Sequence, residues 1–261
     1  MIKLIATDMD GTFLDSNKMF DMDFVSLFYR MQEQNIIFVI ASGNQFYRLY
    51  AKFLPMSESM YFIADNGSFI AHGPHMITCD TMTTDNVSLI CQVLDQYPDL
   101  FYILSGVKAA YALKKDQIHK DILERYYCNY EFVDSFDDIK DSIMKIAVTD
   151  FTDHMQDYSV PLREKIPEEI NIVTSGNEWI DLQNKGTDKG AGMTLLQERL
   201  NIQPEECMAF GDQMNDYQLL QSVKYSYAMA NAVDEIKAIA YGITASNDEQ
   251  GVLKIIREVV K

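Results

Sequence analysis

Residues 2–12 read IKLIATDMDGT, an apolar run that ends in two aspartates and a Gly-Thr pair. Such a short, nearly continuous run is typical of a strand buried on both faces of a parallel sheet. In open α/β sheets, ligands bind just beyond the carboxyl ends of the strands. The stretch therefore predicts that Asp8 and Asp10 stand where chemistry takes place. The structural alternative is a plain Asp-Gly turn with an aspartate as its cap.

The same pattern continues towards residue 82. Apolar runs at 36–41 and 61–64 predict two more buried strands. Between the first and second strands, apolar residues recur with the spacing i, i+3, i+4, i+7, which predicts a helix; they are Phe24, Leu27, Phe28 and Met31. Asp21 is a candidate cap for this helix. Strand, helix and strand in this order predict a βαβ unit with parallel strands.

The pattern resumes near the C-terminus. Strands are predicted at 207–210, 227–229 and 243–244, and apolar stripes predict helices over 193–200 and 252–259. Residues 1–82 and 185–261 are therefore expected to form one α/β core with a doubly wound, mostly parallel sheet.

The central residues 83–184 follow a different pattern. Strands are predicted at 101–104, 110–113, 144–149, 170–174 and 179–182, with helices near 85–96, 116–127 and 152–165. This order suggests hairpins plus helices, which is an α+β arrangement. Because it interrupts the α/β pattern, we expect an inserted domain joined to the core by two linkers.

Charge and composition exclude several classes of function. The chain has 261 residues, 48% of them hydrophobic, and a formal net charge of −17. Such a surface repels nucleic acid and anionic membranes. The four cysteines are scattered without zinc spacing, and no signal peptide or membrane-spanning run is evident. We expect a cytoplasmic protein with a small phosphorylated partner, without nucleic acid or membrane partners, and with no obligate protein partner evident.

Further polar segments follow the predicted strands or begin a helix. They are Ser42-Gly43-Asn44 after 36–41, Lys189-Gly190 at a helix start, and Gly211-Asp212-Gln213-Met214-Asn215-Asp216 after 207–210. If the strands are parallel neighbours, these segments meet Asp8 and Asp10 in one crevice. Clustered carboxylates without histidine or thiol ligands favour Mg²⁺.

This set of residues suits phosphoryl transfer, which depends mainly on positioning and electrostatic stabilisation. A carboxylate can attack phosphorus and form an aspartyl-phosphate. The Ser42 hydroxyl and the amides of Gly43 and Asn44 would surround the transferring group, and Lys189 would supply positive charge. Ser42 is equally suited to be a helix N-cap, and Asn215 and Asp216 to start a helix.

The ordered motifs DMDGT, SGN, Lys-Gly and GDQMND resemble those of the haloacid dehalogenase (HAD) superfamily of phosphatases. The insertion resembles the C2 cap of its Cof-type subfamily (type IIB). The segments ASGNQ, ADNG and AMANA, which begin at residues 41, 64 and 228, are most similar to bacterial sugar phosphatases of that subfamily. The resemblance spans the whole chain. It implies a HAD-like, Rossmann-like core whose inserted cap selects the substrate, and Mg²⁺-dependent hydrolysis of small phosphate monoesters, expected to be sugar phosphates.

The resemblance also implies roles for individual acids. Asp8 would be the nucleophile and a Mg²⁺ ligand. Asp10 would protonate the leaving alcohol, then activate water, and bind the metal through its backbone carbonyl. Asp212 would be the third protein ligand, and Asp216 would act indirectly, through metal-bound water.

Four residues would hold the phosphoryl oxygens, namely Ser42, Gly43, Lys189 and Asn215. Many Cof-type proteins have arginine where this chain has Asn44, so we expect a positive charge to be missing near the substrate. Two other functions use the same residues: a phosphomutase or phosphotransferase with the same intermediate, and a phosphosugar-binding sensor with little turnover.

Overall fold

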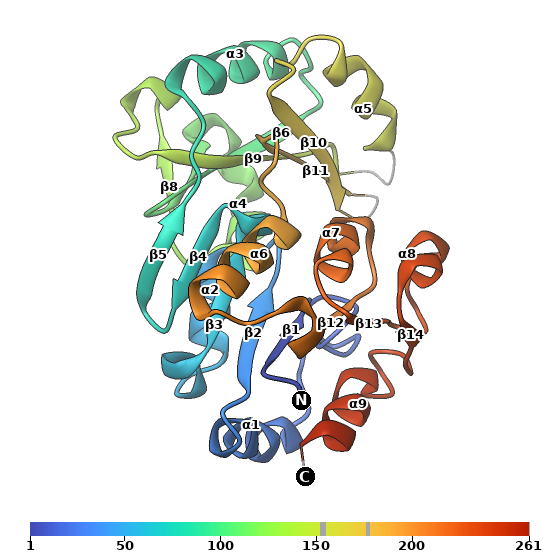
Figure 1. The fold of residues 1–261 in the computed structure, drawn as a ribbon. Coiled ribbons are helices and arrows are strands. Elements are labelled where there is room, and N and C mark those ends of the chain that lie inside the picture. Colours follow the sequence, from blue (N-terminus) through green and yellow to red (C-terminus); the bar gives the residue numbers. More distant parts are fainter. Residues whose placement is uncertain (152–154, 176–177, 261) are drawn as a thin grey trace.

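The computed structural model describes residues 1–151, 155–175 and 178–260. Its described strands form two sheets, which occupy the lower and upper parts of Figure 1. Across the larger, eight-stranded sheet the order is β14 (Gly242–Ile243), β13 (Tyr225–Ala228), β12 (Cys207–Gly211), β1 (Leu4–Thr7), β2 (Ile37–Ala41), β3 (Tyr61–Ala64), β4 (Phe69–His72) and β5 (His75–Cys79).

The predicted parallel core is confirmed. Strand β1 lies between β12 and β2 and is parallel to both, with Thr7 opposite Phe210 on one side and Ile40 on the other. The polar segments that follow these three strands therefore emerge side by side. The chain winds outward from β1 in one direction and from β12 in the other, so the crossovers cover opposite faces.

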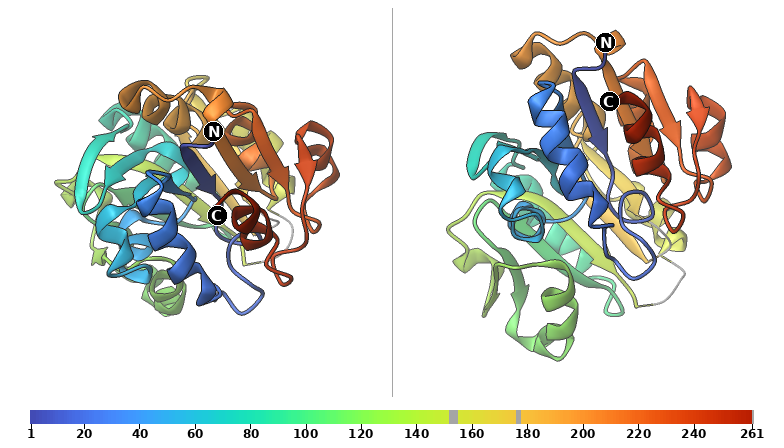
Figure 2. Two further views of the ribbon diagram at one scale, coloured as in Figure 1. Left: turned by 60° about the horizontal axis from the view of Figure 1, so that its bottom comes forward. Right: turned by 90° about the horizontal axis from the view of Figure 1, so that it is seen from below.

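Helices cover this sheet. They are α1 (Asp23–Glu33), α2 (Phe46–Lys52), α6 (Lys189–Leu200), α7 (Tyr217–Gln221), α8 (Asp234–Ile239) and α9 (Gly251–Val259). In α1 the predicted apolar stripe is buried. The Asp21 carboxylate accepts the Asp23 amide at 2.7 Å, although the capping position itself is Met22. The chain termini lie near each other (Figure 2).

The sequence prediction of the core was incomplete at one edge and shifted in two strands. Strand β14 begins and ends one residue before the predicted 243–244. Strands β4 and β5 form an antiparallel hairpin that extends the sheet beyond β3 and was not predicted. Strand β13 begins two residues before the predicted 227 and ends one residue before the predicted 229. None of the helices in the described ranges is both long and apolar enough to cross a membrane.

The second sheet has six strands and lies between β5 and α6 in the sequence. Its order is β10 (Ile170–Ser175), β11 (Trp179–Asn184), β9 (Ile143–Thr149), β6 (Phe101–Gly106), β7 (Ala110–Leu113) and β8 (Tyr130–Val133). Its helices are α3 (Thr84–Leu94), α4 (Lys120–Tyr126) and α5 (Gln156–Arg163). The predicted helix at 116–127 begins as a 3₁₀ turn, and residues 152–154 of the third predicted helix lie outside the described residues.

One pair of neighbouring strands in this sheet is parallel, whereas the other described pairs are antiparallel. Strand β8 was not predicted. It pairs in parallel with β7, and the connection between the two strands contains α4. Side chains alternate along β6: Tyr102 and Leu104 pack with α3 and α5, while Phe101 and Ile103 pack with α4. Helices therefore cover both faces of this sheet along β6, which is an α+β arrangement.

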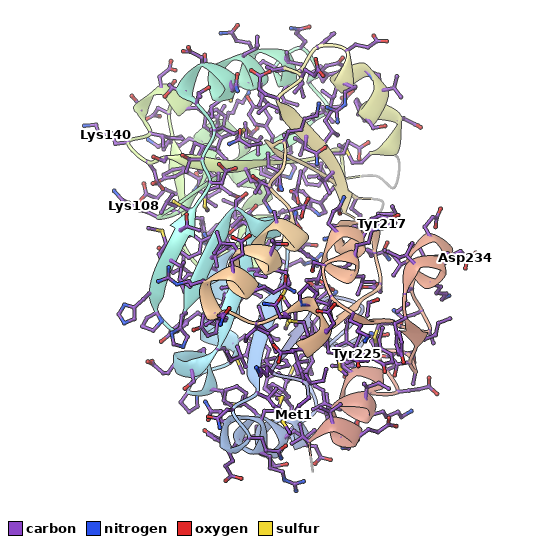
Figure 3. All side chains as sticks on the ribbon, in the orientation of Figure 1. Met1, Lys108, Lys140, Tyr217, Tyr225 and Asp234 are labelled. Carbon is purple, nitrogen blue, oxygen red and sulfur yellow. The ribbon has the colours of Figure 1, made fainter. Side chains whose placement is uncertain are left out.

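Side chains from both parts of the chain extend into the region between the two sheets in Figure 3. The Gln45 side chain, just before α2, accepts the Cys128 amide at 3.0 Å and donates to the Asn129 carbonyl at 3.1 Å. The linkers are tied together where Asn184 donates to Asp80 at 3.1 Å. The cap is thus held against the end of the core from which the polar segments emerge. The domain limits at 82/83 and 184/185 stay a prediction.

Candidate active site

The turn after β1 fixes the first two predicted residues. Asp8 is buried, and its amide donates to the Phe210 carbonyl at 3.1 Å, which ties it to β12. Gly11 has a φ of +81°, and a Cβ there would come within 2.4 Å of the Asp212 carboxylate. Only glycine suits both the left-handed backbone and this close approach. The Asp-Gly-Thr turn is therefore built against the fourth motif rather than being a free surface turn.

Three buried carboxylates gather beyond β1 and β12. One oxygen from each of Asp8, Asp212 and Asp216 lies within 4.8 Å of the others. Burial raises the pKa of Asp212 to about 6, aided by the charge of Asp216 and opposed by a hydrogen bond from Thr12. Burial also raises the pKa of Asp8 well above its ordinary value, with Lys189 opposing the rise. The cluster is electrostatically unfavourable unless cations share it.

Lys189 supplies one such cation. Its side chain is fully buried, and Nζ lies 2.6 Å from Asp8 Oδ1 and 2.5 Å from Asp216 Oδ1. Burial lowers the pKa of Lys189, but the two carboxylates more than reverse this and raise it, so the ammonium stays charged. Asp188 caps the helix that carries it, accepting the Ala191 amide at 2.8 Å. A Cβ on Gly190 would come within 2.5 Å of the Gln218 backbone, which explains the Lys-Gly pair.

Asp216 is more deeply involved than the sequence suggested. Besides binding Lys189, it accepts the amides of Asp212 and Gln213 through Oδ2, at 2.9 and 3.2 Å. Its carboxylate therefore fixes the loop that carries Asp212. Both oxygens are already engaged in hydrogen bonds, and the indirect role of Asp216 stays a prediction.

Asp10 lies outside the three-carboxylate cluster. Its Oδ1 accepts from Lys18 Nζ at 2.8 Å, and its Oδ2 accepts from Asn44 Nδ2 at 2.7 Å. Burial raises the pKa of Asp10, but the Lys18 and Asn44 contacts outweigh burial and leave the pKa below its ordinary value. Asp10 is thus oriented by two donors beside Asp8, as a proton-transferring group would need to be.

The loop after β2 brings Ser42, Gly43 and Asn44 to the same edge. The Ser42 hydroxyl accepts the backbone and side-chain amides of Asn44, each at 3.1 Å. Helix α2 begins only at Phe46, with Gln45 at its capping position, so Ser42 does not cap that helix. Gly43 lets this loop pack closely against Asn66, because a Cβ at this position would lie only 3.0 Å from Asn66 Oδ1.

Asn66 is a residue of this site that the sequence prediction missed. It follows β3 with a left-handed φ of 53° and is buried. Its amide donates to the Ser42 carbonyl at 3.0 Å, its Nδ2 to Asp181 at 2.7 Å, and its Oδ1 accepts from Asn215 at 3.2 Å. The Asp-Asn-Gly run after a predicted strand was the available signal, because Asn tolerates left-handed backbone.

A cavity of about 680 Å³ joins these residues to the cap. Asp8, Asp10, Ser42, Gly43, Asn44, Asp212 and Asn215 line its core side. The cap contributes Arg125, Tyr126, Tyr127, Lys145, Ala147, Glu178, Trp179 and Asp181. All the predicted site residues therefore converge, since Lys189 and Asp216 lie directly behind Asp8.

The expected lack of positive charge was wrong. Although position 44 itself is uncharged, Lys18, Arg48, Lys52 and Arg125 all line the cavity. These four residues come from separate parts of the chain. Only Arg48 and Lys52 are close in sequence, one turn apart on α2. In a chain of net charge −17, these side chains mark the part of the surface suited to an anion.

Comparisons with known proteins agree with this geometry. A family model of haloacid dehalogenase-like hydrolases matches residues 5–256. The 5-amino-6-(5-phospho-D-ribitylamino)uracil phosphatase YbjI of Escherichia coli (strain K12) is 34% identical over 262 residues, which cover 100% of this chain and 97% of that protein. The HMP-PP phosphatase of Escherichia fergusonii is 25% identical over 247 residues, covering 91% and 88%. The crystal structure of SMU.1108c from Streptococcus mutans UA159 superposes with a TM-score of 0.90 at 32% identity, covering 99% of both chains.

Proposed function

Since this chain belongs to the haloacid dehalogenase-like hydrolases and is a phosphoric monoester hydrolase of the Cof type, we propose that it is a Mg²⁺-dependent phosphatase of small sugar phosphates. One observation carries the proposal. The buried Asp8 carboxylate stands beside Asp212 and Asp216, with oxygens within 4.8 Å, at the edge of the sheet where Lys189 supplies a fixed cation. That arrangement suits attack of a carboxylate on phosphorus.

The donor set fits magnesium. Every candidate ligand among the described residues of the cluster is a carboxylate oxygen, without histidine or thiolate, and this is the chemistry that Mg²⁺ prefers. Asp8 and Asp212 would hold the ion, with the Asp10 carbonyl completing the protein ligands as the family resemblance implies. When bound, the ion would neutralise the carboxylates and the phosphoryl oxygens.

The protein's own residues would carry out two steps. Asp8 attacks phosphorus and the bond from phosphorus to the leaving oxygen breaks. Asp10, after taking up a proton from solvent or from the water of the previous turnover, gives that proton to the leaving oxygen. Water then attacks the aspartyl-phosphate, Asp10 accepts the water proton, and inorganic phosphate leaves. Lys18 and Asn44 hold the Asp10 carboxylate in place, at 2.8 and 2.7 Å. Lys189 favours the ionised form of Asp8 against the effect of burial and orients it before attack.

The loop after β2 would bind the phosphoryl group. Its Ser42 hydroxyl and Gly43 amide are donors that border the cavity, Asn44 holds the Ser42 hydroxyl in place, and Asn215 borders the cavity from the fourth motif. Backbone amides and hydroxyls of this kind stabilise the charge of a transferring phosphoryl group. The cations along the cavity would raise the local concentration of anionic substrates.

The sugar-phosphate class draws support from the cavity and from one relative. The volume of about 680 Å³ suits a small metabolite, and its walls combine charged and aromatic side chains. The relative of 34% identity is named for a substrate with a phosphorylated ribityl chain. The name of the HMP-PP phosphatase indicates a different substrate, so a panel of phosphate esters is needed.

The test uses p-nitrophenyl phosphate and a panel of sugar phosphates, with and without Mg²⁺. Asp8→Asn should abolish phosphate release while circular dichroism stays unchanged, and removal of Mg²⁺ with a chelator should have the same effect on the native enzyme. Asp234→Asn, on the exposed start of α8, is the matched control. Turnover retained by Asp8→Asn contradicts the nucleophile. A second phosphorylated product without free phosphate identifies a phosphotransferase instead.

A further inference from the structure

Two strands of the inserted sheet carry charged side chains on the face that borders the cavity. Along β9 and β11, Ile146 and Leu182 pack into the apolar core of the cap. Lys145 and Asp181 lie on the opposite face and line the cavity. Gln183 pairs directly with Lys145 and Ala147 with Asp181, so the ammonium and the carboxylate are diagonal neighbours.

Both side chains are almost completely buried, and Lys145 is held by the core. Its Nζ donates to the Gly43 carbonyl at 2.8 Å and lies 3.5 Å from Asp181 and 3.6 Å from Asp65. Burial lowers the pKa of Lys145, but the carboxylates of Asp181 and Asp65 outweigh burial and raise it, so the ammonium stays charged. The pair is therefore fixed relative to the phosphate-binding loop.

The carboxylate of Asp181 keeps hydrogen-bonding capacity facing the cavity. Its Oδ2 accepts from Asn66 at 2.7 Å and lies near Lys145, while its Oδ1 accepts no hydrogen bond from the described residues. A charged oxygen in such a buried place is stabilised by a donor. The proposed mechanism uses neither Asp181 nor Lys145. Asp181 Oδ1 can therefore accept from the leaving group, and Lys145, whose distances to Asp181 and Asp65 are long at 3.5 and 3.6 Å, can turn one of its three N–H groups towards it.

A hydroxyl group fits this pair because it both donates and accepts a hydrogen bond. It can donate to Asp181 and accept from Lys145 at the same time. A second anionic group would meet the negative charges of Asp181 and Glu178, and an alkyl chain would leave Asp181 Oδ1 without a donor. We propose that Lys145 and Asp181 are specificity-determining residues that select phosphate esters whose leaving group carries hydroxyls, an inference that rests on the proposed phosphatase function.

The experiment compares two substrates with the same five-carbon chain, D-ribitol 5-phosphate and n-pentyl phosphate. The measured quantity is the ratio of their kcat/KM values, which is unaffected by the folded fraction of a variant. The native enzyme should prefer ribitol 5-phosphate, and Lys145→Met and Asp181→Leu should each lower the ratio about 10- to 100-fold, the range for hydrogen bonds to charged groups. The double variant removes both charges of the pair. Its fold-loss in the kcat/KM ratio should be no larger than the product of the fold-losses of the two single variants.

The exposed Lys114–Asp134 pair, at 2.6 Å just beyond the ends of β7 and β8, provides the control. Lys114→Met and Asp134→Leu should leave the ratio unchanged. Equal losses for both substrates in the Lys145 and Asp181 variants would overturn the proposal, because they would show only a structural link between cap and core. A native enzyme that hydrolyses p-nitrophenyl phosphate without preferring ribitol 5-phosphate would also overturn it, while leaving the phosphatase function intact.

A binding measurement gives an independent test of the same preference for the hydroxyl-bearing ester. In the Asp8→Asn background, calorimetry should detect tighter binding of ribitol 5-phosphate than of n-pentyl phosphate. Adding Lys145→Met or Asp181→Leu should remove that difference. Equal affinities before the second substitution would contradict the assignment, whatever the catalytic rates.

Discussion

Lys189 Nζ lies 2.6 Å from Asp8 Oδ1 in a site that excludes bulk water from the lysine completely. The same ammonium binds Asp216 at 2.5 Å, and Asp216 in turn holds the backbone of Asp212. One cation therefore joins the motif after β1 to the motif after β12. Its removal would affect both the reactivity of Asp8 and the stability of the core.

Lys189→Met should lower kcat for p-nitrophenyl phosphate by about 100-fold or more, the usual cost of losing one stabilising donor. It should also lower the free energy of unfolding by about 3–5 kcal/mol, because buried carboxylates lose their counterion. Enzyme assays and urea unfolding measure the two effects. Lys3→Met, which breaks the half-exposed contact with Glu206, should change neither very much. A Lys189 variant with native turnover would refute its role.

Asp10→Asn should separate the two chemical steps. The p-nitrophenolate group leaves without needing a proton, so the first turnover should persist and release about one p-nitrophenolate per active site. Hydrolysis of the aspartyl-phosphate should then slow about 100-fold, because no base activates water. Rapid-mixing absorbance measurements detect the burst. Unchanged steady-state turnover would exclude Asp10 as the acid and base.

Most of the core and its motifs could be predicted because their signals are local. The apolar runs before Asp8, Ser42 and Asp212 identify strands, and parallel packing brings their ends together. The β4–β5 hairpin was missed because its two strands are short and their outer positions are exposed, which weakens the apolar pattern. Strand β8 was missed for the same reason, since it has no fully buried residue.

The full set of residues that lines the cavity could not be predicted from local pattern, because the core and the cap both contribute to it. Lys18, Arg48 and Arg125 meet only through tertiary structure, so Asn44 alone suggested a site poor in positive charge. Asn66 carried a signal in its Asp-Asn-Gly context, but its contacts with the Ser42 loop and with Asp181 depend on folding. Lys145 interrupts an otherwise apolar strand, and such an interruption becomes informative once the strand and its buried face are known.

The cations on α2 should act mainly by attracting the substrate. Arg48→Gln and Lys52→Gln should each lower kcat/KM several-fold at low ionic strength, with little change in kcat, and should weaken its dependence on salt. Arg30→Gln, on the exposed side of α1, is the matched control. Assays from low to physiological salt test the prediction. A salt dependence identical to that of the native enzyme would show that these side chains do not attract the substrate.

Asp65 should make the stability of the protein depend on pH. It is buried beside Lys145, and burial raises its pKa from 3.8 to about 6, with Lys145 opposing and Asp181 adding to the rise. Because the folded state binds this proton more tightly than the unfolded state, the contribution of Asp65 to stability is full below pH 3.8. It is lost as the pH rises through about 6, a change of about 3 kcal/mol.

Asp65→Asn removes this titration, so the native protein should lose stability relative to the variant as the pH rises from 4 to 7. Urea unfolding of both proteins at a series of pH values measures the difference. Asp234→Asn, whose side chain is fully exposed, should give a difference that does not vary over the same range. A constant difference between the native protein and Asp65→Asn would mean that Asp65 is ionised in the folded state throughout, with Lys145 fully compensating its burial.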